Sequence, residues 1–291
     1  MKRNQIKVIE VNGNAITSHS GKTEALTGHL KSILATETSA EWRFDPDELY
    51  IDLPRVNADQ LVAPFMTQEA VAAVPVRAMN RCSALGPDGF GPGFYQAAWA
   101  MVEDRVMEFL HAFQIGQADM DRINRAFVVL IPKRCDAVTA DAHRPICLQN
   151  CGPKIVSKIL TTRLQEQITT LVDTDQTGFI RGRSISENFI LATELVQCCY
   201  KRRAPTLVLK LDFAKAFDTV NWGSLLRILH ARGFPDTWQT WIKSLLSSSK
   251  SAVLVNGVPG YENRCRDVMQ DANDIKNLPR GWCLGVEYDT T

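Results

Sequence analysis

Residues 206–222 read TLVLKLDFAKAFDTVNW, and the chain is organised around this stretch. Its first half is an apolar run of strand length. Alternate residues from Leu207 to Phe213 fall on one face, so Asp212 leaves the end of the strand on the opposite face. Asp218 follows after a short turn. A carboxylate at the end of a buried strand is costly unless it is paired or bound to a metal. The stretch therefore predicts either a carboxylate that caps a turn or a metal ligand.

Composition places the chain among ordinary globular proteins, since 45% of its 291 residues are hydrophobic and 22% are charged. No apolar run approaches the roughly 18 residues of a membrane span. The basic N-terminus lacks the apolar segment of a signal peptide. The eight cysteines are scattered without paired spacing, which favours reduced thiols. We therefore expect an intracellular protein of the nucleus or cytoplasm with no contact to a membrane.

Charge is distributed unevenly along the chain, although the net charge is only +1. Residues 122–250 carry 19 Lys and Arg against 10 Asp and Glu. A basic middle between acidic ends is a modest indication of a polyanionic partner. An unevenly charged, solvated surface would give the same pattern.

Periodicity and turn residues predict many short elements. Asn12-Gly13 predicts a hairpin within residues 7–16, and a short helix is expected over 24–34. Further strands are expected at 126–131 and 251–255, with a second tight hairpin at Asn256-Gly257 and an extended segment opening at His143. Helices are expected over 154–171, from Ser186 to about 203, over 221–232 with Asn221 as N-cap, and over 236–246 with Asp236 as N-cap.

Six stretches occur in a fixed order that is far more specific than any of them alone. They are SALGPDGFGPGFYQAAW (83–99), VLIPK (129–133), HRPICLQN (143–150), KIVSKILTTRL (154–164), QTGFIRGRSISEN (176–188) and LKLDFAKAFDTVNW (209–222). Together they resemble the reverse transcriptase of non-LTR (LINE-type) retrotransposons over roughly residues 60–270.

The resemblance implies an α+β fold: the fingers and partial palm of a right-hand polymerase, mostly helical with a small incomplete antiparallel sheet. Three regions follow from it. Residues 1–60 form a loosely structured connector, residues 61–270 form the fingers and partial palm, and residues 271–291 form a divergent, disordered tail. The implied activity is RNA-directed DNA polymerisation, a nucleotidyl transfer with an RNA template, a DNA primer and a dNTP as partners.

The resemblance also implies a metal site in the opening stretch. Asp212 matches the first metal-binding aspartate of the palm, and the backbone carbonyl of Phe213 matches a second ligand. Two Mg²⁺ ions held there would clamp the attacking and leaving oxygens. Phe217 matches the residue beneath the incoming sugar. Asp218 fits a structural acceptor for the turn better than a ligand.

Basic residues in other motifs match positions that bind phosphates. Lys133 and Arg144 match fingers residues that meet the incoming triphosphate, and a planar guanidinium suits phosphate especially well. Gln176, Arg181 and Arg183 match a loop near the template, where contacts would use charge and the 2′-OH. Exposed salt bridges are the ordinary alternative role for such residues.

The sequence departs from the family after Gln270, where Asp271 stands in place of an expected Gly. No Tyr/Phe-x-Asp-Asp motif follows in the 291 residues. We therefore expect a truncated polymerase that is catalytically inactive as written, because one palm aspartate should not hold two Mg²⁺ ions. A non-catalytic RNA- or DNA-binding remnant and a non-functional pseudogene product are the alternatives.

Overall fold

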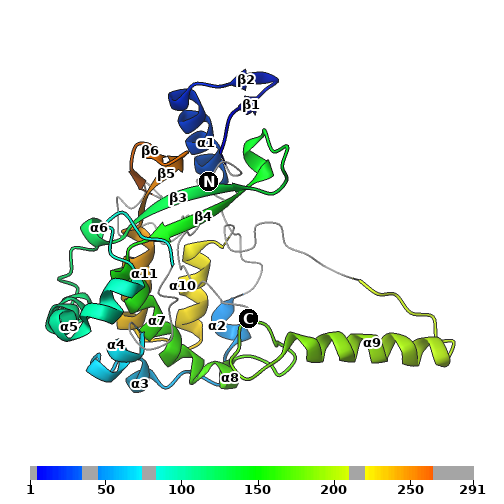
Figure 1. Ribbon diagram of the computed structural model, residues 1–291. Coiled ribbons are helices and arrows are strands. Elements are labelled where there is room, and N and C mark those ends of the chain that lie inside the picture. The colour runs from blue at the N-terminus through cyan, green and yellow to red at the C-terminus, as the bar shows by residue number, and fades with distance from the viewer. Residues whose placement is uncertain (1–4, 35–44, 74–82, 210–219, 265–291) are drawn as a thin grey trace.

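A computed structural model describes residues 5–34, 45–73, 83–209 and 220–264 (Figure 1). The fold is mixed α+β and predominantly helical, as predicted. The strands are β1 (Ile9–Val11), β2 (Asn14–Ile16), β3 (Arg125–Pro132), β4 (His143–Gln149), β5 (Lys250–Val255), β6 (Val258–Pro259) and β7 (Asn263–Arg264). The longer helices are α1 (His19–Leu34), α5 (Pro92–Gln114), α7 (Cys151–Gln165), α9 (Ile185–Lys201), α10 (Trp222–Ala231) and α11 (Asp236–Ser247). The shorter helices are α2 (Pro46–Leu49), α3 (Ala58–Val62), α4 (Thr67–Ala73), α6 (Met120–Ile123) and α8 (Ile168–Leu171).

The main sheet has the order β4-β3-β5-β6, and β7 also pairs with β5. β3 pairs antiparallel with β4, whereas β3 and β5 run parallel. The prediction of an antiparallel sheet is therefore wrong in this respect, and the sheet is mixed. The long helical stretch between β4 and β5 explains the parallel pair, because a parallel neighbour needs a crossover connection instead of a tight turn.

The N-terminal segment packs on one face of this sheet. Ile9 and Leu26 are buried with Val128 of β3 and Val255 of β5 in one apolar cluster. Lys22 of α1 is buried as well, and its Nζ donates hydrogen bonds to the carbonyls of residues 6 and 7. Residues 5–34 are thus an ordered layer, which differs from the loosely structured connector expected for residues 1–60. Their small apolar surface is stabilised by the sheet, which the local sequence does not reveal.

Two predicted tight turns are confirmed by backbone geometry. Asn12 and Gly13 have φ angles of 52° and 79° between β1 and β2. Asn256 and Gly257 have φ angles of 51° and 88° between β5 and β6. Positive φ at both central positions is the signature of the type I′ turn, whose twist matches that of paired strands.

The helices form a second, larger core around α7. Ile155, Val156 and Ile159 of α7 are buried against α3, α4, α5 and α11. Arg163, at the end of α7, is also buried, and its guanidinium contacts Glu69 of α4 through two hydrogen bonds of 2.6 and 2.7 Å. It also donates to three backbone carbonyls between residues 61 and 64. Arg163 therefore joins α7 to the segment that carries α3 and α4.

Several predicted boundaries need correction. The helix expected over 154–171 is divided into α7 and α8. Ser184, not Ser186, caps α9 by accepting a hydrogen bond from the N–H of residue 186. Pro235 is the N-cap of α11, so Asp236 is already its first helical residue. Asn221 does cap α10, with its Oδ1 2.9 Å from the N of Ser224.

The strand expected at the start of the opening stretch is absent from its described part. Residues 206–209 are irregular, and Leu207 and Leu209 are exposed. An apolar run forms a stable strand only when neighbouring strands pair with it. No strand of the described residues does so. Residues 210–219 lie outside the described residues, as does the tail expected at 271–291.

Candidate nucleotide and nucleic-acid site

Lys133 and Arg144 lie together at one end of the β3–β4 hairpin. Ile131 pairs with Arg144, and Pro132 pairs with His143. The N–H of Lys133 donates to the carbonyl of Ala142 at 2.8 Å, which extends the ladder by one residue. Because side chains alternate along a strand, Lys133 and Arg144 fall on the same face. The hairpin thus brings together the two cations that were predicted to meet a triphosphate.

The two cations differ in their local partners. The Nζ of Lys133 donates to the carbonyl of Asp141 at 2.8 Å, which leaves other ammonium protons for a ligand. The Asp141 carboxylate lies 3.2 Å from Nε2 of His29 on α1. Arg144 is exposed, and its guanidinium forms no hydrogen bond or ion pair within the described part of the chain. Arg144 is therefore the cation with the most freedom to bind an anion.

Arg183 organises the loop that precedes α9. Its guanidinium donates to the carbonyls of Val172, Asp173 and Gln176, the last at 2.7 Å. These bonds hold residues 172–176 against the start of α9. Arg183 was predicted to meet a nucleic-acid strand, and in this structure its donors are turned toward its own loop.

The other two predicted residues of this loop are exposed. The side chain of Gln176 donates to the carbonyl of Gly178 at 3.2 Å. The N–H of Arg181 donates to Oε1 of Gln165 on α7 at 2.9 Å, which fixes its backbone and leaves the guanidinium at the surface. Figure 1 shows this loop, between α8 and α9, at the opposite side of the body from β3 and β4. The predicted site residues that the structure describes therefore fall into two separate groups.

The predicted metal site lies outside the described residues. This applies to Asp212, to the Phe213 carbonyl, to Phe217 and to Asp218. Within the ranges that the structure describes, no group of three or more His, Cys, Asp or Glu side chains is arranged to hold a metal ion. No helix in those ranges combines the length and apolar character that crossing a membrane requires.

Asn150 closes the motif at 143–150 and is a positioning residue for which no role was predicted. Its buried side chain donates to the carbonyl of Ile123 at 3.0 Å and accepts from the N–H of Asp88 at 3.1 Å. The second bond spans 62 residues of sequence. The position of Asn150 between an apolar strand and an apolar helix could have indicated a structural role. The sequence does not show that Asp88 is its partner.

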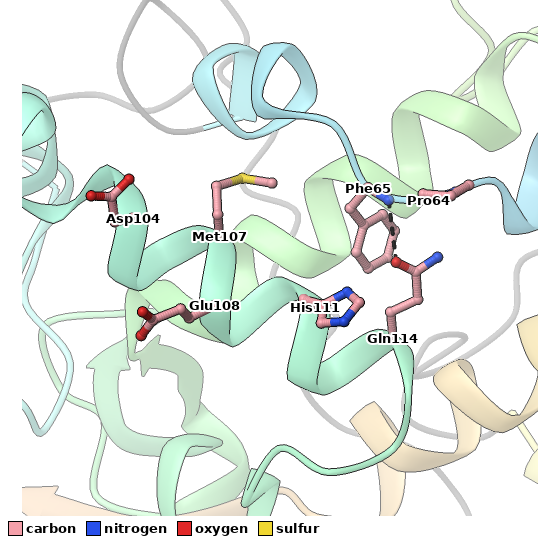
Figure 2. Close-up of a pocket in the computed structure, with 7 residues that line it drawn as sticks. All are labelled: Pro64, Phe65, Asp104, Met107, Glu108, His111 and Gln114. Carbon is pink, nitrogen blue, oxygen red and sulfur yellow. Dashed lines mark hydrogen bonds between the residues drawn. The ribbon is translucent and has the colours of Figure 1, made fainter.

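A pocket of about 500 Å³ lies apart from the basic residues, along α5 (Figure 2). It is lined by Pro64, Phe65, Asp104, Met107, Glu108, His111 and Gln114. Figure 2 shows the two carboxylates at one end and the ring of Phe65 at the other. The two carboxylates disfavour phosphate, so we do not assign the nucleotide to this pocket.

Known proteins give an independent comparison. Residues 131–270 match the family described as reverse transcriptase (RNA-dependent DNA polymerase). A 149 kDa protein of transposon TX1 from Xenopus laevis is 28% identical over 214 residues, covering 72% of this chain and 16% of that protein. The Pol polyprotein of the type-1 retrotransposable element R2 from Nasonia vitripennis is 26% identical over 180 residues, covering 62% and 17%. That of the type-2 element R2DM from Drosophila melanogaster is 26% identical over 162 residues, covering 56% and 15%.

The chain thus spans about one sixth of the length of these relatives. The matched residues contain both predicted groups of basic residues, on β3–β4 and in the loop before α9. The match to the family and the naming of the relatives as retrotransposon proteins agree with the motif order. Residues 131–270 therefore match the reverse transcriptase (RNA-dependent DNA polymerase) family, and the similarity to retrotransposon proteins supports a non-LTR reverse transcriptase domain.

Proposed function

We propose that this chain binds a nucleoside triphosphate and a single-stranded template through two basic sites, and that it is catalytically inactive on its own. The observation that carries the proposal is Arg144, an exposed guanidinium without a partner among the described side chains, beside Lys133 on the same hairpin. Two cations on one hairpin can pair with part of the negative charge of a triphosphate. The hairpin fixes their spacing before a ligand arrives, which lowers the entropic cost of binding.

Template binding is assigned to the loop before α9. Arg181 contributes the charge, and Gln176 contributes an amide for the sugar or the backbone. Arg183 is better suited to hold the loop in shape, because its guanidinium already bonds three carbonyls. Contacts of this kind recognise the backbone of RNA and its 2′-OH groups instead of the bases.

The divalent metal that the reverse transcriptase family implies would be held by Asp212 and the carbonyl of Phe213. We propose Mg²⁺, whose chemistry is to stabilise the attacking and leaving oxygens of nucleotidyl transfer. Asp212 is the single carboxylate in the 291 residues that matches a metal ligand of the palm. Mg²⁺ depends on very few protein carboxylates, so one carboxylate should not retain the catalytic pair of ions.

Binding is tested by titrating labelled single-stranded RNA and a fluorescent dNTP separately into the purified chain at low salt. Arg144→Ala should weaken dNTP binding roughly tenfold, as expected when a charged hydrogen bond is lost. Arg181→Ala should weaken RNA binding and reduce its salt dependence by about one phosphate contact. Arg105→Ala, which removes an exposed arginine of α5, should change neither.

If Arg105→Ala weakened binding as much as Arg144→Ala, the loss would be explained by the change in net charge and not by a specific site. Unchanged dNTP binding in Arg144→Ala would remove the triphosphate assignment.

Inactivity is tested by primer extension on an RNA template with Mg²⁺. The wild-type chain should give no template-dependent product. Extension that disappears in Asp212→Ala would overturn the proposal of inactivity and would leave the binding proposal standing.

A further inference from the structure

The loop before α5 and the first turn of that helix present a pair of exposed aromatic rings. Phe90 and Phe94 are 47% and 42% exposed, and their ring centroids lie 4.6 Å apart at an interplanar angle of 46°. Phe94 also meets the edge of Tyr95, with centroids 5.4 Å apart and an angle of 84°. Single exposed apolar side chains are common on protein surfaces, but contiguous ones mark sites of interaction.

This loop is held firmly, although it is rich in glycine. The N–H of Asp88 donates to the buried amide of Asn150, and the N–H of Phe90 donates to Oδ1 of Asp88 in a tight turn. Gly86 lies so close to Asn150 that a Cβ at this position would come within 2.5–2.7 Å of its atoms. The aromatic pair therefore sits on a fixed support that α7 and the end of β4 provide.

Lys154 of α7 places positive charge near Asp88, which lies in the same loop as Phe90. Partial burial raises the pKa of Asp88, and the charge of Lys154 on α7 opposes this rise. Lys154 likewise opposes the effect of burial on Cys151, whose pKa is raised to about 11. Lys154 is therefore close to the loop, and Lys158 lies one turn farther along α7 and is exposed.

The position of the loop relates it to the domain already assigned. Asn150 follows β4 directly, whereas Arg144 lies near the opposite end of that strand. Six residues of extended chain separate the two, which is about 20 Å. Residues 83–99 lie outside the matched range of 131–270. The aromatic pair is therefore separate from the proposed triphosphate site.

We propose that Phe90 and Phe94 form a stacking platform for unpaired bases of a single nucleic-acid strand, with Lys154 and Lys158 available to its phosphates. Rigid aromatic faces beside cations are the recurring solution for such strands, because every base has a π-face and every linkage has a charge. The turn supplies rigidity, so little entropy is lost when a base stacks. This inference rests on the proposed function, since it adds a subsite to a chain that we propose to bind nucleic acid.

The test separates stacking from charge by comparing two labelled single strands of about twelve nucleotides, one normal and one abasic. Fluorescence anisotropy at low salt should show that the wild-type chain prefers the normal strand by roughly tenfold. The double variant Phe90→Ala/Phe94→Ala should lose this preference and bind both strands as weakly as the wild type binds the abasic one. Phe189→Ala, which removes an exposed ring of α9, is the matched control and should keep the preference.

Phe90→Trp checks that the ring itself matters, because a larger aromatic face should retain or increase the preference for bases. Circular dichroism establishes that each variant is folded. The loss is expected with RNA and DNA strands alike, and a loss with one of them assigns the platform to that strand. A preference that persists in the double variant overturns the platform while the proposed function stands. Failure of the wild type to bind either strand overturns both.

Discussion

Helices α7 and α9 are similar in sequence pattern and opposite in environment. Both are amphipathic, with 15 and 17 residues. α7 buries eight residues in the helical core, including Arg163. α9 buries none, and Phe189 and Tyr200 are 75% and 85% exposed. Figure 1 shows α9 extending away from the body of the molecule, while α7 lies at its centre.

The difference shows that an apolar stripe specifies a helix with a face to cover, but does not specify what covers it. For α7 the cover comes from α3, α4, α5 and α11, which are distant in sequence. Helical periodicity is a local property, whereas burial depends on how the whole chain folds back on itself.

Removing Arg163 should have the largest effect on stability. Arg163→Ala leaves Glu69 without its partner and three carbonyls without their donor, so the free energy of unfolding should fall by about 3–5 kcal/mol. Urea unfolding followed by circular dichroism measures this change. Arg105→Ala breaks an exposed pair with Glu108 and should change the midpoint very little. A similar midpoint for both variants would show that Arg163 does not join the helices.

Matched truncations should separate the two apolar stripes. Ile159→Ala in α7 creates a cavity in the core and should cost about 2–4 kcal/mol. Leu195→Ala in α9 removes a side chain that is 57% exposed and should change stability by less than about 0.5 kcal/mol. The same urea experiment measures both. A cost for Leu195→Ala comparable to that for Ile159→Ala would mean that α9 is covered in solution.

Thiol reactivity should report the same contrast without a mutation. Burial raises the pKa of the Cys151 thiol in α7 from 9.0 to about 11. Only the thiolate reacts with iodoacetamide. Near pH 8, the fraction of Cys151 present as thiolate is therefore about a hundredfold smaller than that of an ordinary thiol. Cys198 of α9 is exposed. Iodoacetamide labelling followed by peptide mass spectrometry should modify Cys198 first, at a rate at least on the order of a hundredfold faster. Equal rates would contradict the burial of α7.

Acid should weaken the α4–α7 contact, with the smallest of these effects. Burial alone would raise the pKa of Glu69, but hydrogen bonds from Arg163 and the N–H of Met66 outweigh it, so the pKa lies below its ordinary value of 4.5. A lowered native pKa stabilises the fold above about pH 4.5, and this stabilisation is lost as the pH falls through the native pKa. Glu69→Gln should therefore show a shallower loss of melting temperature below pH 4.5 than the wild type. If the melting temperatures of the variant and the wild type fell equally with pH, the Glu69 carboxylate would not contribute to this pH dependence.

Some features of the fold and of the candidate site could be predicted from the sequence. The two Asn-Gly turns and the Asn221 cap were predicted because each depends on the conformational preference of one or two residues. The family was predicted from six motifs in order. Lys133 and Arg144 were predicted as a pair of phosphate ligands, and the hairpin brings them together. Their role in binding a triphosphate stays a prediction.

Other features could not be predicted because they depend on distant partners. The parallel pairing of β3 with β5 joins residues about 125 positions apart. The N-terminal layer packs its apolar side chains against β3 and β5, which lie more than 90 residues away in the sequence. Arg183 was expected to face a nucleic acid, yet its nearest acceptors are carbonyls of its own loop, whose shape the motif does not encode.

The sequence by itself determined the type of domain, the turns and the periodic faces of the helices, because these follow from local residue preferences and from motif order. Only the tertiary structure decided which faces are buried, that Arg163 and Asn150 are connecting residues, and that Phe90 and Phe94 stand exposed on a rigid support. The physical reason is that burial and hydrogen-bond partnership are properties of residue pairs, and the partners here lie tens of residues apart.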